Sequence, residues 1–320
     1  MDKVCFGIDI GGTSVKCGLF TDNGALLDKW EVPTRKENNG EHILEDIAES
    51  IQKKMKEREL GFSDVAGVGM GVPGPITEEG KVLKCANLGW GIFNVNEKMS
   101  DLIHLPVVAA NDANVAALGE MWMGGGKGYE DVIMVTLGTG VGGGVILGGK
   151  VVAGSNGAGG EIGHMIVNPK ETDVCGCGGH GHLEQYASAT GIVRLAKKKL
   201  KESDVDSSLR NLVSISAKDI FDAAKEEDAV AKELIEELGF YLGTALAHVA
   251  CVVDPQVFVI GGGVSRAGNI LIETVEKYYN NNILFALQQK EFRLAELGND
   301  AGIYGAAKLI LMKDASMQPA

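Results

Sequence analysis

Residues 4–21 read VCFGIDIGGTSVKCGLFT, and residues 132–152 read VIMVTLGTGVGGGVILGGKVV. Each stretch is an apolar, β-branched run, then a cluster of glycine and threonine, then a second apolar run of strand character. Each cluster is too short for a helical crossover, so both stretches predict a β-hairpin with a glycine turn. Because one unusual hairpin occurs twice, we expect the chain to consist of two related halves.

The rest of the chain alternates between strand and helix patterns. The predicted elements are a helix over 43–60, a buried strand entering a Gly/Pro turn over 65–76, a strand over 106–112 with a helix from 113 to 123, largely helical structure over 218–253, a strand, triple glycine and helix over 254–279, and a closing helix over 301–313. This order predicts an α/β fold of two lobes with a central cleft.

Bulk composition is that of an ordinary globular protein. The chain has 320 residues, 45% of them hydrophobic and 23% charged, which suggests about two domains. A formal net charge of −13 argues against a nucleic-acid-binding surface. The most apolar stretch, 245–264, is interrupted by His248, Asp254 and Pro255, and we expect no membrane span.

The first residues already have a strand pattern, so we expect no secretory signal. Four cysteines stand singly in apolar or mixed runs, as reduced and buried thiols do: Cys5, Cys17, Cys85 and Cys251. Both observations predict a cytoplasmic protein.

The two glycine turns offer backbone N–H groups that no side chain covers, and such arrays of amides bind phosphate oxygens. Thr13 would add a hydroxyl donor and Lys16 a positive charge to the first turn, Gly11–Gly12. The second turn, Gly138–Gly144, repeats the pattern, and a third glycine cluster follows at 261–263. The alternative is that these glycines only make tight turns, but two matched hairpins and a third cluster favour phosphate binding.

Two common nucleotide motifs are excluded by context. Gly138, Gly140 and Gly143 fit G-x-G-x-x-G, but a strand pattern follows where a dinucleotide-binding fold needs a helix. A near-match to the Walker loop fails because Val151 stands where Ser or Thr must hold magnesium.

A cysteine- and histidine-bearing loop predicts a metal site. Cys175 and Cys177 are separated by one glycine, His180 and His182 follow closely, and His164 lies upstream. Two thiols and several imidazoles in one glycine-rich loop are typical of a closed, tetrahedral zinc site with a structural role. Scattered surface Cys and His residues are the alternative.

The chain resembles the ROK family of sugar kinases, and within it the bacterial glucokinase branch. The family's motifs occur here in order as GIDIGGTSVKCG, GVPGP, NDANVAALGE, VTLGTGVGGGVI, GEIGH, CGC followed by LEQYASATG, and VIGGGVS. The resemblance covers nearly the whole chain and implies an actin-like, ribonuclease-H-like ATPase fold. We expect a smaller N-terminal lobe over 1–115, completed by the helix 301–314, and a larger C-terminal lobe over 116–300 that carries the zinc loop.

The resemblance also implies ATP-dependent phosphorylation of glucose to glucose 6-phosphate by a homodimer. Asp112 falls on the family's catalytic base; from local sequence alone it would be a helix N-cap. The residues expected to contact the sugar are Asn87, Asn111, Asp112, Glu161, His164 and Glu184.

The resemblance assigns the glycine clusters to the nucleotide and Asp9 to the ATP-bound magnesium. The residues expected to bind the nucleotide are Asp9, Gly11, Gly12, Thr13, Lys16, Gly138, Thr139, Gly140, Gly142, Gly261, Gly262 and Gly263. The family's zinc ligands, one His and three Cys, match His164, Cys175 and Cys177, and His182 stands at the third Cys position. Whether His182 or His180 replaces that Cys stays open.

Three other functions share features with this sequence. A ROK kinase for N-acetylmannosamine, fructose or another hexose has the same chemistry, and the sequence also leaves open donors other than ATP. A sugar-responsive regulator is disfavoured because the first strand begins within the first few residues, which leaves no room for a helix-turn-helix domain. A nicotinamide oxidoreductase is excluded by the strand after the second glycine turn.

Overall fold

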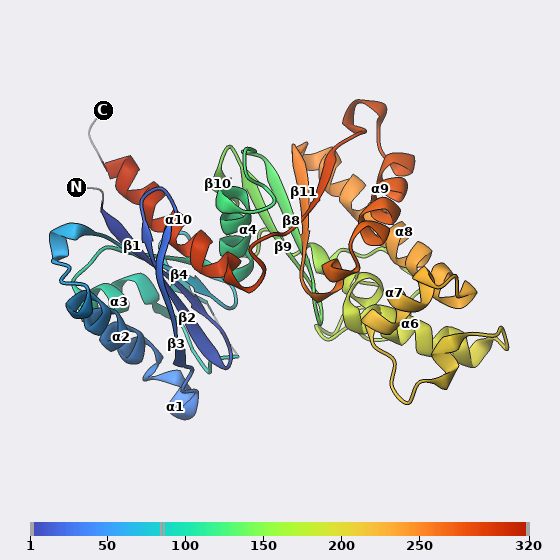
Figure 1. Cartoon of the computed structure of the whole chain (residues 1–320), viewed down its shortest axis with the longest axis horizontal. Helices are drawn as coiled ribbons and strands as arrows, with labels where there is room; N and C mark the ends of the chain where they lie inside the picture. Colours follow the sequence, from blue (N-terminus) through green and yellow to red (C-terminus); the bar gives the residue numbers. More distant parts are fainter. Residues whose placement is uncertain (1–2, 84, 86, 318–320) are drawn as a thin grey trace. The chain divides into compact units, whose positions relative to one another are not determined.

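The structure, a computed structural model, describes residues 3–83, 85 and 87–317 (Figure 1). The chain forms two compact units. The N-terminal unit comprises residues 1–130, 144–160 and 296–320, and the C-terminal unit comprises residues 131–143 and 161–295. The chain therefore passes between the units at 130/131, 143/144, 160/161 and 295/296.

These unit boundaries differ from the lobe boundaries expected at 115/116 and 300/301, which stay predictions. Residues 116–130 belong with the N-terminal unit because helix α4 (Asp112–Met123) packs along the C-terminal helix α10 (Ala301–Met317).

The N-terminal unit is built around a five-stranded sheet with the strand order β3-β2-β1-β4-β7. Its remaining elements are β1 (Val4–Ile10), β2 (Ser14–Thr21), β3 (Leu26–Pro33), α1 (Glu37–Gly40), α2 (Ile43–Glu57), η1 (Phe62–Asp64), β4 (Val65–Val72), β5 (Lys81–Val82), β6 (Phe93–Asn94), α3 (Val95–Ile103), β7 (Val107–Asn111), β10 (Lys150–Val151) and η6 (Gly298–Asp300). Strands β1 and β2 pair antiparallel over Val4–Ile10 and confirm the first predicted hairpin, while β4 and β7 extend the sheet in parallel.

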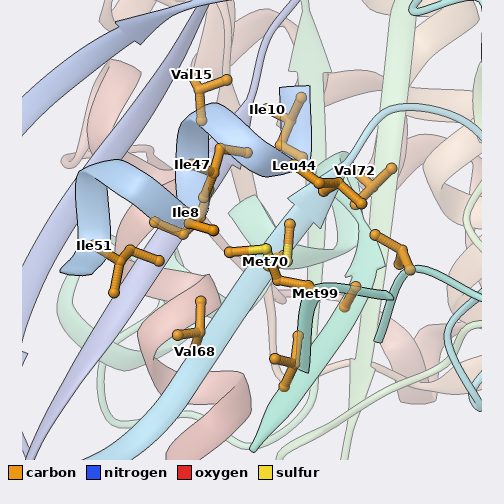
Figure 2. Packing of buried hydrophobic residues seen from close by; sticks show 14 of the residues in the cluster. Ile8, Ile10, Val15, Leu44, Ile47, Ile51, Val68, Met70, Val72 and Met99 are labelled. Atoms are coloured by element: carbon orange, nitrogen blue, oxygen red, sulfur yellow. The ribbon is translucent and has the colours of Figure 1, made fainter. Parts of the chain in front are cut away.

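The two faces of this sheet have separate cores. Ile8 and Ile10 of β1 point toward α2, where they pack with Ile47 and with Met70 of β4 (Figure 2). Because side chains alternate along a strand, Cys5, Gly7 and Asp9 face the other way. On that opposite face Cys5 packs with apolar residues of α10.

Helix α10 approaches the sheet and α4 at backbone contact distance. A methyl group on Gly69 of β4 would lie 1.7 Å from the carbonyl oxygen of Ala306. A methyl group on Gly305 would lie 1.6 Å from the carbonyl oxygen of Val115 in α4. Neither position has room for a side chain, so these glycines set how closely the three elements pack.

A buried carboxylate ties α4 to the last crossing between the units. Glu120 is fully buried, and its side chain accepts hydrogen bonds from the N–H groups of Gly125 (2.9 Å), Glu296 (3.0 Å) and Leu297 (2.9 Å). Three backbone donors compensate the desolvation of this charge. The segment that enters α10 is thereby held against the helix that begins at Asp112.

The C-terminal unit contains most of the second sheet, and the division between units passes through β9. Its elements are β8 (Val132–Leu137), β9 (Val141–Leu147), η2 (Ile162–His164), α5 (Glu184–Ala187), α6 (Ala189–Glu202), η3 (Ser208–Asn211), α7 (Ala217–Lys225), α8 (Ala229–Val253), β11 (Val257–Gly261), η4 (Gly263–Ala267), α9 (Asn269–Asn282), η5 (Phe285–Leu287) and β12 (Glu291–Leu294). The sheet has the order β10-β9-β8-β11-β12, and β11 runs parallel to β8 and β12.

Both sheets share one strand order when each is numbered from its own hairpin, third-second-first-fourth-fifth. This common order agrees with the two related halves that the repeated hairpin predicted. The largely helical segment expected over 218–253 consists of two helices, α7 and α8, and Asp228 caps α8 by accepting a hydrogen bond from the N–H of Ala231.

Helix α8 is long and apolar enough to cross a membrane by length and composition, with half of its most apolar window buried. Its buried residues pack against α9, α5, α6 and α7, as in the core helix of a globular unit.

We expect Gly305→Ala to lower the free energy of unfolding by at least about 2 kcal/mol, because α10 must move away from α4 to admit the methyl group. Gly91→Ala is the matched control, since a methyl group there meets nothing within 4 Å. Urea unfolding curves of both variants measure the difference. Equal stability of the two variants would contradict backbone contact between α10 and α4.

Candidate active site and metal cluster

The first glycine turn joins β1 to β2 and is held from one side. The N–H of Gly11 donates to the carbonyl of Ser14 (3.1 Å), which closes the turn. Thr34, just after β3, donates its N–H to the carbonyl of Thr13 (3.0 Å) and its hydroxyl to the carbonyl of Gly11 (2.8 Å). The turn is thus a rigid loop on which Gly12 and Thr13 are exposed.

Two lysines lie near this turn. The ammonium of Lys16 donates to the carbonyl of Asn299, just before α10 (2.9 Å). The ammonium of Lys36 lies over the turn, 3.7 Å from the place that a methyl group on Gly12 would occupy. Sequence reasoning named Lys16 and missed Lys36; the available signal was the basic segment TRK directly after strand β3.

Asp9 lies on the face of β1 that α10 covers. A methyl group on Gly302, in the first turn of α10, would lie 2.5 Å from the carboxyl carbon of Asp9. Burial raises the pKa of Asp9, and the neighbouring Lys16 lowers it in part. Among the described residues none donates a hydrogen bond to this carboxylate, so a cation beside it would compensate its desolvation.

Asp112 is the first residue of α4, directly after β7. The N-cap is Asn111, whose side-chain oxygen accepts from the N–H groups of Ala113 (3.0 Å) and Asn114 (3.2 Å). Asn111 also donates its amide to the carbonyl of Gly74, in the Gly/Pro turn after β4 (3.2 Å). Asp112 is therefore not needed as the cap of α4, although its Oδ1 accepts from the N–H of Ala113 (2.9 Å).

Asn87 lies in an exposed turn between β5 and β6. Backbone hydrogen bonds from Leu88 and Trp90 to the carbonyl of Cys85 close this turn, and the indole N–H of Trp90 donates to the carbonyl of Gly40 (3.0 Å). The loop is thus anchored to the end of α1.

The second glycine turn is supported by the start of α6. The N–H of Gly138 donates to the carbonyl of Gly140 (3.0 Å). From α6, the N–H of Ala189 donates to the carbonyl of Gly138 (2.8 Å) and the hydroxyl of Thr190 to that of Thr139 (2.5 Å). This turn therefore borders a helix N-terminus, which favours negatively charged groups.

The triple glycine lies beside that turn. Gly262 has φ of +83°, and a methyl group there would lie 2.5 Å from the carbonyl oxygen of Leu137, the last residue of β8. Because β11 pairs with β8, both glycine clusters of the C-terminal unit follow neighbouring strands.

Three expected sugar ligands cluster in the C-terminal unit. The ring nitrogens of His164 lie 3.9 Å from carboxylate oxygens of Glu161 and Glu184. A methyl group on Gly140 would lie 2.6 Å from Oε2 of Glu184, so the second turn touches the carboxylate at the start of α5. A cavity of about 360 Å³ is lined by Thr139, Gly140, Cys175, Glu184 and other residues of this unit.

The expected metal ligands are gathered in one place. The ligand atoms of His164, Cys175, Cys177 and His182 all lie within 4.8 Å of one another. Sγ of Cys177 is 3.5 Å from Sγ of Cys175 and 3.2 Å from Nδ1 of His182. His180 contacts the carbonyl of Asp173 instead, through Nδ1 at 3.2 Å, and lies outside this cluster.

These atoms suit zinc in type and spacing. Four ligands at about 2.0–2.3 Å from one ion would themselves lie about 3.3–3.8 Å apart. Burial and the contact of its Sγ with Glu184 (2.7 Å) raise the pKa of Cys175 to about 11, so the metal-free thiol is neutral near pH 7. A bound ion would displace that proton.

An ionic network holds the segment before Cys175. Arg194 of α6 donates to Glu171 (3.0 Å) and Asp173 (2.6 Å), and the hydroxyl of Tyr186 donates to Glu171 (2.6 Å). Burial opposes ionisation of Glu171, but these donors and the N–H of Asp173 lower its pKa to about 2. The network anchors the metal loop to α5 and α6.

Comparisons with known proteins place this geometry in a family. Residues 5–313 match the model of the ROK family. The glucokinase of Halalkalibacterium halodurans is 40% identical over 322 residues, covering 99% of this chain and 98% of that protein. The xylose repressor of Caldicellulosiruptor bescii is 29% identical over 309 residues, covering 95% of this chain and 77% of the repressor.

A solved structure supports the same family. The ROK family glucokinase of Streptomyces griseus, crystallised with glucose and AMPPNP, has a TM-score of 0.71 and 34% identity, covering 96% of this chain and 98% of that one. The predicted actin-like α/β fold is thereby confirmed. With two glycine-turn hairpins, an aspartate at the start of α4 and a His/Cys cluster of matching motif order, the chain belongs to the ROK family.

Proposed function

We propose that this protein transfers the γ-phosphate of ATP to glucose and forms glucose 6-phosphate. The observation that carries the proposal is the 40% identity to a glucokinase over almost the full length of both chains. The Streptomyces griseus glucokinase, solved with glucose and an ATP analogue, supports the same substrates.

Asp112 is the proposed general base. A sugar hydroxyl must lose its proton as it attacks phosphorus, and a placed carboxylate accepts that proton. Because Asn111 caps α4, the cap does not depend on the carboxylate of Asp112. Asp112 is the first residue of α4, which packs against α10 and is tied by Glu120 to the backbone of residues 296–297. These contacts fix the position of its carboxylate.

The proposed sugar ligands come from both units. They are Asn87, Asn111 and Asp112 of the N-terminal unit and Glu161, His164 and Glu184 of the C-terminal unit. Carboxylates accept from sugar hydroxyls, and amides and imidazoles donate to or accept from them. Asn111 already makes two hydrogen bonds through its oxygen and one through its amide, so its amide has one N–H left for the sugar.

The nucleotide is proposed to lie on the glycine turns. The first turn, with Gly11, Gly12, Thr13 and Lys16, and the second, with Gly138, Thr139, Gly140 and Gly142, hold the phosphates, and Gly261–Gly263 borders the adenosine. Magnesium neutralises triphosphate charge when it is bound. Asp9 fits it, as a half-buried carboxylate without a hydrogen-bond donor among the residues that the structure describes.

His164, Cys175, Cys177 and His182 are proposed to hold a structural zinc ion. Four protein ligands leave no open coordination position, so the ion would stabilise the loop that carries Glu161, His164 and Glu184 rather than take part in the reaction.

Two alternative functions have weaker support. A kinase for N-acetylmannosamine or fructose has the same residues available, and the higher identity to glucokinases favours glucose. A sugar-responsive regulator is disfavoured because the identity to the repressor, 29%, is lower than the 40% identity to the glucokinase. We propose a cytoplasmic enzyme that binds no nucleic acid.

The homodimer implied by the family also stays a proposal. The ring of Phe240 on α8 packs edge to face on Tyr278 of α9 at 5.6 Å, and Phe285 after α9 is 81% exposed. A second copy would cover such apolar surface. Sedimentation equilibrium would test the two-chain assembly.

The function is tested by ADP release with a panel of glucose, mannose, fructose, N-acetylglucosamine and N-acetylmannosamine. We expect glucose to give the highest kcat/KM, with magnesium and ATP present. A higher kcat/KM for an amino sugar or for fructose would assign the chain to another ROK kinase class.

We expect Asp112→Asn to lower kcat at least about 100-fold, because the hydroxyl loses its proton acceptor. Thermal stability should hardly change, since Asn111 keeps the helix cap. Asp101→Asn, an exposed change of the same charge in α3, is the control and should turn over normally. Near-normal kcat in Asp112→Asn would show that another group takes the proton.

Elemental analysis of protein purified without a histidine tag should find about one zinc per chain. His182→Ala should lose the metal, whereas His180→Ala should keep it, because His180 lies outside the cluster. Less than about 0.3 zinc per chain with full activity would contradict the site. Loss of the metal only in His180→Ala would show that His180, and not His182, is the fourth ligand.

A further inference from the structure

The segment after β3 follows the first glycine turn closely. Thr34 makes two hydrogen bonds to backbone carbonyls of that turn, at Thr13 and Gly11. The carbonyl of Lys36, the residue before α1, accepts from the N–H of Gly40, the last residue of α1. The backbone on both sides of Lys36 is thus anchored, so its side chain extends from a defined point.

The ammonium of Lys36 lies over the open face of this turn. Apart from the chain neighbours of Gly12, its Nζ is the one side-chain atom of the described residues within 4 Å of a methyl group placed on Gly12. No carboxylate among the described residues pairs with it, although the preceding Arg35 is engaged by Asp46 through a bidentate contact. An exposed, unpaired cation over an amide-lined turn is suited to a polyanion.

Lys16, the lysine expected from the sequence to add charge to this turn, also contacts another segment. In the β1–β2 register Lys16 lies opposite Asp9, on the side of the sheet that α10 covers. Its ammonium donates to the carbonyl of Asn299, just before α10. Lys16 thus contacts the segment before α10, and Lys36, from a different element, is a second lysine beside the turn.

We propose that Lys36 binds a terminal phosphate oxygen of ATP and, with the amides of the first turn, orients the phosphate tail for transfer. The proposal deepens the kinase function and rests on it. A lysine acts on phosphate as a mobile point charge, so its contribution grows with the number of phosphates it can reach. Lys36 is accordingly a nucleotide-binding residue that discriminates a triphosphate from a monophosphate.

The test is isothermal titration calorimetry with AMPPNP, ADP and AMP in the presence of magnesium. Lys36→Met should weaken AMPPNP binding about tenfold or more, ADP binding less, and AMP binding hardly at all. Lys36→Arg should recover most of the loss, because the charge is kept. Lys56→Met, an exposed lysine of α2, removes the same charge away from the turn and should leave all three affinities unchanged.

Steady-state kinetics supplies a second readout. Lys36→Met should raise KM for ATP while KM for glucose stays within about twofold. Because Lys36 is exposed, the Lys36→Met variant should have the melting temperature of the wild type. An unchanged melting temperature would exclude misfolding as the cause of the higher KM for ATP.

Equal weakening of AMP and AMPPNP would place Lys36 near the nucleoside and overturn the proposal. The same holds if Lys36→Met binds AMPPNP normally, or if only Lys16→Met shows the phosphate-dependent loss. If the wild type phosphorylates glucose and Lys36→Met has the same affinity for AMPPNP and the same KM for ATP, this proposal alone is rejected. A wild type that binds no AMPPNP rejects the kinase function together with it.

Discussion

The close packing of α10 on glycines is the contact on which the N-terminal unit depends. Gly69 of β4 and Gly305 of α10 bring backbone against backbone, and a side chain at either position would overlap a carbonyl oxygen. Such contact leaves little freedom in the position of α10 relative to the sheet and α4. Asp9, covered by Gly302, and Asp112, at the start of α4, are both placed through this one helix.

The repeated hairpin has been adapted differently in the two units. In the N-terminal unit the turn is supported by Thr34 from the neighbouring segment and has Lys36 above it. In the C-terminal unit the turn is supported by α6 and touches Glu184. The first turn therefore borders a cation, and the second borders a helix N-terminus and a proposed sugar ligand. The two sheets share one strand order, but their glycine turns lie in different chemical environments.

Local patterns were sufficient for features that are formed by neighbours in sequence. The hairpins, the strand-to-helix junction at Asp112 and the Cys/His loop could all be predicted because each lies within a short segment. The family motifs, rather than the local pattern, pointed to Asp112 as more than a helix cap. The structure shows why the local reading was insufficient, since Asn111 makes the cap.

Features formed by segments that are distant in the sequence could not be predicted from local patterns. The contact of Asp9 with Gly302 joins the first strand to the last helix, and no periodicity encodes it. The arrangement of His182 and His180 depends on how the loop folds back, which brings His182 to Cys177 and turns His180 to the carbonyl of Asp173. Lys36 was missed because its relation to Gly12 arises from strand pairing, not from sequence spacing.

The position of α10 after all the elements that it covers has a consequence for biosynthesis. The strands that it covers are complete by Asn111, so they leave the ribosome long before residues 301–317 are made. Until then the glycine-lined face of β1 and β4 has no partner, while the long insertion between them and α10 can already form its own core. In a nascent chain this face of the N-terminal sheet stays uncovered until α10 has been made. A chain that stops short of α10 would present the uncovered face to chaperones and proteases.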